Sequence, residues 1–142
     1  MNTMAPIRPI QQQACRVRLG PGPIAAAQAR AQVRAAIRGW DVPVDPDVAI
    51  LLTSELVTNA VTHGTGEPVT LAIDCSGGRL RVDVHDTSCA LPLLSEAPGD
   101  AETGRGLMLV ASLAAEWGFY RTPVGKAVYF TLTCAPAEAG RA

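Results

Sequence analysis

The stretch from Asp45 to Gly64 constrains the fold more than any other part of the sequence, because it carries both ends of a helix. Asp45 and Pro46 precede a run of apolar residues, and Gly64 follows it. An aspartate cap, a proline in the first turn and a terminal glycine are the signals that begin and end a helix. The sequence therefore predicts a helix over residues 47–63.

A line of polar residues runs along this predicted helix. At about 100° per residue, Glu55, Asn59 and His63 lie one above the other. Burying such groups without partners costs about 1–3 kcal/mol apiece, so we expect them to meet a bound ligand. A satisfied hydrogen-bond pair between Glu55 and Asn59 is the structural alternative. The apolar residues around this line are Val48, Leu51, Leu52 and Leu56, and those on the opposite side are Ile50, Val57 and Val61. Apolar residues on both sides indicate a helix that is covered on both faces.

Alternating apolar and polar residues mark the strands of the chain. The clearest pair is a hairpin whose turn is Ser76-Gly77-Gly78 and whose second strand leads directly into Asp86. The patterns predict strands over 14–19, 69–75, 80–85, 117–121 and 127–133, and further helices over 24–38 and 107–115. Strands that pair with strands, with the helices set apart, favour an α+β fold: a two-layer sandwich with helices on one face of a mainly antiparallel sheet. Outward-facing Arg16 and Arg18 suit an edge strand.

One folded domain over residues 14–134 is predicted, with flexible tails over 1–13 and 135–142. Of the 142 residues, 48% are hydrophobic and 18% charged, which is typical of a globular chain. No apolar run reaches the roughly 18 residues of a membrane span, and the N-terminus lacks the apolar centre of a signal peptide. We therefore expect a cytoplasmic protein that binds no membrane. The widely spaced Cys15, Cys75, Cys89 and Cys134 favour buried free thiols over a metal site or a disulfide framework.

Charge argues against nucleic acid as a partner, since the formal net charge is −1 and the basic residues form no block. A basic stripe of Arg30, Arg34 and Arg38 lies along the first predicted helix. It is either a solvated face or a docking surface for an acidic protein.

Two further segments carry chemistry that suits a nucleotide. Gly104-Arg105-Gly106 precedes a predicted helix, where glycine backbone and unpaired N–H groups can approach phosphate. Asp86, at the end of an apolar strand, is able to accept a hydrogen bond from an exocyclic amine. A carboxamide such as that of Asn59 can bind Mg²⁺ through its oxygen, and Glu55 can deprotonate a nucleophile.

The order of these segments resembles a known family. The segment SELVTNAVTHG is similar to the N box of the GHKL (Bergerat-fold) ATPases, DVHDTS to their first glycine box, and TGRGLMLVASLA to their second. Within that superfamily the chain is most similar to the small serine kinases that act as bacterial anti-sigma factors. The resemblance covers about residues 14–134.

The resemblance implies a role for each matching residue. Glu55 would be the general base, Asn59 the Mg²⁺ ligand and Asp86 the anchor for adenine, while residues 88–103 would form a lid over ATP. His63 would either shape the pocket or pack in the core, and His85 is assigned a structural role. The nucleotide-binding residues implied in this way are Asn59, Asp86, Ser88, Gly104, Arg105, Gly106 and Leu107.

The activity implied is transfer of the γ-phosphoryl group of ATP, with Mg²⁺, to a serine of an anti-sigma-antagonist protein. The same molecule would sequester a sigma factor, and relatives suggest a homodimer through the first strand and helix. Two departures favour the alternative of a non-catalytic regulatory module with weak or no nucleotide binding. Ser88 stands where the first glycine box has glycine, and Ala127 stands where threonine often follows Gly125-Lys126.

Overall fold

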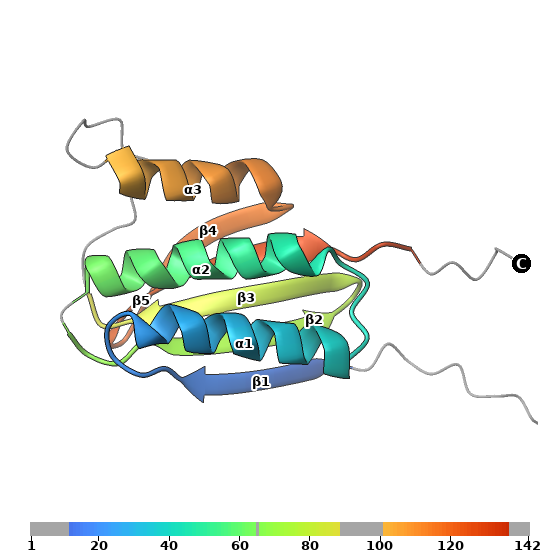
Figure 1. Ribbon diagram of the computed structural model, residues 1–142, viewed down its shortest axis with the longest axis horizontal. Coiled ribbons are helices and arrows are strands. Elements are labelled where there is room, and N and C mark those ends of the chain that lie inside the picture. Colours follow the sequence, from blue (N-terminus) through green and yellow to red (C-terminus); the bar gives the residue numbers. More distant parts are fainter. Residues whose placement is uncertain (1–11, 65, 89–100, 137–142) are drawn as a thin grey trace, which may run out of the picture.

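The computed structural model describes residues 12–64, 66–88 and 101–136, which form two layers (Figure 1). In this part of the chain, three helices lie over one face of a five-stranded sheet with strand order β1-β2-β3-β5-β4. All neighbouring strands are antiparallel. The elements are β1 (Gln13–Arg18), α1 (Ile24–Gly39), α2 (Pro46–Thr62), β2 (Thr70–Ser76), β3 (Arg79–Asp86), α3 (Ala101–Leu113), β4 (Glu116–Thr122) and β5 (Gly125–Thr133). The predicted α+β sandwich is confirmed.

The hydrophobic core lies between the helices and the sheet, and alternation along the strands determines which residues enter it. Every second residue of the central strands faces the helices, as the period of two requires. The arginines of β1 point away from the core, and β1 is an edge strand as predicted. The buried strand residues facing the helices are Leu71, Ile73, Leu80, Val82, Val84, Val128, Phe130 and Leu132.

Helix α2 has the predicted ends and a covered position. The Asp45 side chain accepts a hydrogen bond from the backbone N–H of Asp47 at 2.9 Å, Pro46 is the first helical residue, and His63 follows the last. The helix lies between α1 and α3 and over β3 (Figure 1). Leu52, Leu56 and Val57 are buried, whereas Leu51, predicted on the apolar face, is 40% exposed.

Helix α3 differs from the prediction at its beginning. It starts at Ala101, so Gly104, Arg105 and Gly106 lie in its first two turns and not in a loop that precedes it. Residues 101–106 have no apolar period and two glycines, which disfavour helix locally, so these turns could not be predicted from the residues. Leu107 and Val110, both buried, anchor the helix to the core, and such packing commonly outweighs local propensity. The helix ends at Leu113, two residues before the predicted end.

Several expectations concern residues outside the described ranges. The central part of the expected lid, residues 89–100, with Cys89, and most of both expected tails lie there. Within the described ranges, Cys15, Cys75 and Cys134 are free thiols as predicted, but they are half-buried and not buried. No helix in those ranges is long and apolar enough to cross a membrane.

Candidate functional site

The predicted site residues gather at one end of the molecule. The C-terminal end of α2, the end of β3 and the beginning of α3 lie at the same end of the sandwich (Figure 1). The antiparallel register of β3 and β5 adds the beginning of β5, since Asp86 is directly opposite Lys126. Segments that are far apart in the sequence thus lie at the same end of the molecule.

Glu55 lies against the second glycine segment. A Cβ atom added to Gly106 would lie 3.4 Å from Glu55 Oε1 and 3.5 Å from its Cδ, so the carboxylate of α2 directly faces the backbone of α3. Both elements are in contact along this boundary. A carboxylate is thus held next to the glycine-containing turns that would receive phosphates.

Asn59 lies one helical turn beyond Glu55 and has an unpartnered buried atom. Its Oδ1 is inaccessible to solvent and accepts no hydrogen bond from any group in the described part of the chain. Buried side-chain oxygens nearly always accept a hydrogen bond, and leaving one without a partner costs about 1–3 kcal/mol of stability. The predicted alternative of a satisfied Glu55–Asn59 hydrogen-bond pair is therefore wrong for this oxygen.

Asp86 is held by a partner that the sequence reading missed. Lys126 Nζ donates hydrogen bonds to Asp86 Oδ1 at 3.0 Å and to Oδ2 at 2.9 Å. The backbone N–H of Ser88 donates to Oδ1 at 2.8 Å. The side chains of Lys126 and Asp86 are only 5% and 4% exposed. Charges that are this buried are tolerated when they are paired and hydrogen-bonded.

A signal for Lys126 was present in the sequence. It is the only lysine of the chain, and it is in phase with Val128, Phe130 and Leu132 on the core-facing side of β5. A charged residue at a position that alternation assigns to the interior requires a buried partner. The register of β3 and β5, which identifies that partner, could not be read from the sequence.

Gly125 allows the two strands to approach at this point. A Cβ atom there would overlap the carbonyl oxygen of Asp86 and lie 2.5 Å from the Cα of Thr87. No side chain fits in that space, so only glycine permits this approach of β5 to the end of β3.

The remaining residues singled out from the sequence differ in their burial. Ser88 is buried beside Asp86, and Leu107, only 1% exposed, belongs to the core. His63 is exposed, so the alternative that it packs in the core is wrong. Ala127, at the position of the family's threonine, is fully buried.

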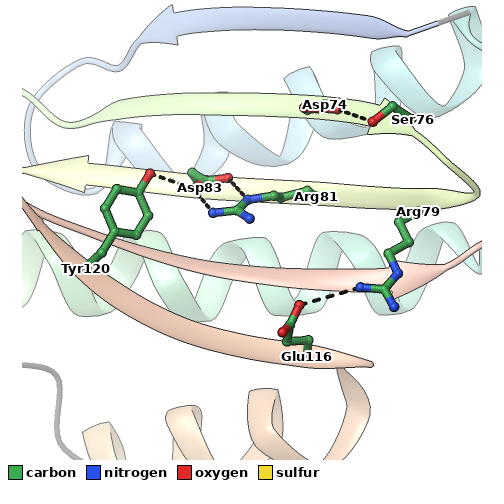
Figure 2. A network of polar contacts seen from close by, with 7 residues as sticks. All are labelled: Asp74, Ser76, Arg79, Arg81, Asp83, Glu116 and Tyr120. Carbon is green, nitrogen blue, oxygen red and sulfur yellow. Dashed lines mark hydrogen bonds and ion pairs between the residues drawn. The ribbon is translucent and has the colours of Figure 1, made fainter.

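A separate polar cluster covers part of the opposite face of the sheet (Figure 2). Arg81 donates to both oxygens of Asp83 at 2.8 and 2.9 Å, and the Tyr120 hydroxyl donates to Asp83 Oδ2 at 2.9 Å. The guanidinium of Arg81 lies 4.0 Å from the centre of the Tyr129 ring. The carboxylate of Asp83 raises the pKa of Arg81 above its usual range. A wide, shallow hollow of about 620 Å³ borders this cluster.

His85 lies on the same face, away from Glu55 and Asn59. Its ring meets that of Tyr120 edge-on at 6.3 Å. Burial, and then the positive charge of Arg16, lower the pKa of His85 below its usual value. His85 thus lies on the side of β3 opposite Val84, as predicted, and its structural role stays a prediction.

Comparison with protein families identifies the class of the molecule. Residues 21–132 match the family described as the histidine kinase-like ATPase domain. The matched segment includes α1, α2, α3 and all the site residues, and so the chain belongs to this family of ATP-binding, kinase-like ATPase domains. No curated protein matches the sequence significantly.

Proposed function

We propose that the chain is an ATP- and Mg²⁺-dependent serine kinase that phosphorylates an anti-sigma-antagonist protein and sequesters a sigma factor. The observation that carries the catalytic part of the proposal is the pair formed by Glu55 and Gly106. A carboxylate next to the predicted phosphate-binding turns is in position to act as a base, which a site that only binds nucleotide does not require. Membership of the histidine kinase-like ATPase family supports ATP as the bound nucleotide.

The chain's residues suit a magnesium-bound triphosphate. The buried Oδ1 of Asn59 is an unpartnered oxygen of the kind that Mg²⁺ prefers. Magnesium bound there, together with phosphates and water, would neutralise the negative charge of the triphosphate. The backbone of Gly104, Arg105 and Gly106 in the first two turns of α3 would hold the phosphates.

Glu55 would act on the acceptor. It would take the proton of a serine hydroxyl as the serine oxygen bonds to the γ-phosphorus and the bond to the β-phosphate breaks, which releases ADP. The rest of the catalysis would be positioning and charge stabilisation. The partners and the expected cytoplasmic homodimer rest on the resemblance to anti-sigma kinases.

A second candidate function, a regulatory module that acts by protein docking, is favoured by the ion pair of Lys126 and Asp86. The ammonium of Lys126 binds both oxygens of Asp86, the residue assigned to adenine. Together with Ser88 and Ala127 in place of glycine and threonine, this favours a regulatory module that acts by protein docking and binds nucleotide weakly or not at all.

A phosphoryl-transfer assay separates the two candidates. With γ-labelled ATP and purified anti-sigma-antagonist proteins, we expect the wild-type chain to label one antagonist. Glu55→Gln should reduce transfer at least a hundredfold, since general-base catalysis contributes about 10²–10⁴-fold, while ATP affinity changes little.

Glu67→Gln provides a matched control, because Glu67 is exposed in the segment after α2. This variant should transfer phosphate at the wild-type rate. Absence of label with tight antagonist or sigma-factor binding would favour the regulatory module. Loss of both transfer and ATP binding in Glu55→Gln would refute the role of Glu55 as the base.

A further inference from the structure

The ion pair of Asp86 and Lys126 forms a single recognition unit across β3 and β5. The two residues are directly opposite in the register, both face the helices, and both are buried. Their backbones are brought together by the close approach at Gly125. Since the Nζ atom of Lys126 lies within 3.0 Å of both oxygens of Asp86, a group that binds this carboxylate also lies close to the ammonium of Lys126.

The hydrogen bonds within the described residues leave this unit with at least one acceptor position and at least one donor. A carboxylate accepts at about four positions, and an ammonium group has three donors. Lys126 takes one position on each oxygen of Asp86, and the Ser88 N–H takes a second position on Oδ1. One position on Oδ2 and at least one N–H of Lys126 therefore remain.

We propose that Lys126 is a second base-reading residue, which donates a hydrogen bond to the ring nitrogen N1 of adenine while Asp86 accepts one from the 6-amino group. Adenine presents a donor and an acceptor side by side on this edge, which complements the acceptor and donor that remain on the pair. The inference rests on the proposed nucleotide-binding function and deepens it. It also gives the buried lysine a role that is compatible with nucleotide binding, whereas the regulatory-module alternative treats it as an obstruction.

Two nucleotide analogues separate the two contacts. 1-Deaza-ATP has carbon in place of N1 and keeps the amine, whereas purine riboside triphosphate keeps N1 and lacks the amine. By calorimetry with Mg²⁺, each analogue should bind the wild-type chain about tenfold more weakly than ATP, the size expected for one hydrogen bond to a charged group. In Lys126→Met, ATP and 1-deaza-ATP should bind equally, and the purine analogue should remain weaker than ATP.

Two further variants control for the loss of a charge and for an unpaired buried carboxylate. Asp86→Asn/Lys126→Met removes both charges, so no buried charge is left unpaired, and it too should bind ATP and 1-deaza-ATP equally. Arg121→Met removes the exposed cation opposite Lys126 on β4 and should keep the wild-type ratios. Circular dichroism establishes that each variant is folded.

The outcomes distinguish this inference from the function on which it rests. If Lys126 only stabilises the fold, Lys126→Met changes the affinity for ATP and for 1-deaza-ATP by the same factor, and the tenfold ratio persists. That result, or the absence of any penalty for 1-deaza-ATP in the wild-type chain, would overturn the inference alone. A wild-type chain that binds none of the three nucleotides would overturn the proposed function and this inference with it.

Discussion

A side chain at position 125 would collide with backbone atoms at the end of the neighbouring strand β3. The atoms in its way are the carbonyl group of Asp86 and the Cα of Thr87. Backbone atoms in a paired strand cannot move aside as the end of a flexible side chain can. At the scale of single residues, the absence of a Cβ at Gly125 is therefore a condition for the pairing of Asp86 with Lys126.

Gly125→Ala should lower the free energy of unfolding by about 1–3 kcal/mol, the usual cost of inserting atoms into a filled space. It should also weaken ATP binding, because the strand shift moves Asp86. Urea unfolding and calorimetry measure the two effects. Gly39→Ala is the control, since nothing lies within 4 Å of a Cβ there and alanine is the better helix former. It should be as stable as the wild-type chain or more so, and equal stability of both variants would contradict the argument.

At the scale of elements, the cluster in Figure 2 joins the edge strand β4 to β3 across β5. The Tyr120 hydroxyl on β4 donates a hydrogen bond to Asp83 on β3 at 2.9 Å. Burial, and then this hydrogen bond, raise the pKa of Tyr120 above its usual value. Because the folded pKa exceeds the unfolded one, the contribution to stability is complete below about pH 10 and is lost as the pH rises further.

Tyr120→Phe should therefore lose about 1 kcal/mol of stability at neutral pH and respond less to alkali. Urea unfolding between pH 8 and 11 measures both effects. We expect the two stability curves to converge above pH 10, where the wild-type chain loses the advantage of its protonated hydroxyl. Curves that stay parallel over this range would show that the hydroxyl does not contribute in this way.

The elements also show what the sequence could and could not predict. The central hairpin, α1, α2 and the last strand pair were predicted within a few residues, because burial on one face leaves a period in the sequence. The first turns of α3 were missed, since packing of Leu107 and Val110 maintains them against two glycines. The proximity of Glu55 to Gly106 followed only from the family resemblance, and the pairing of Asp86 with Lys126 depends on a register between distant strands.

At the scale of the whole molecule, the ends of α2 and β3 and the beginnings of α3 and β5 place the candidate site at one end of the sandwich, and the polar cluster lies on the other side of the sheet. A ligand that binds only the folded chain stabilises all of it, by about 2.7 kcal/mol when the ligand is at a hundred times its Kd. Binding at the site therefore has a readout in global unfolding. Asn59 is suited to this test, because its buried oxygen has no hydrogen-bond partner in the described part of the chain and therefore costs stability.

Asn59→Ala should separate stability from binding. Without ligand, its free energy of unfolding should equal that of the wild-type chain or exceed it by up to about 1 kcal/mol, because an unpartnered buried oxygen is removed and alanine favours helix. With Mg²⁺ and ATP, the wild-type chain should gain stability and the variant should not. Thr58→Ala, at the exposed neighbouring position, reports the effect of helix propensity alone and should keep the gain. If Asn59→Ala is strongly destabilised without ligand, or gains as much from Mg²⁺ and ATP as the wild-type chain, then the carboxamide serves the fold and the magnesium role assigned to it fails.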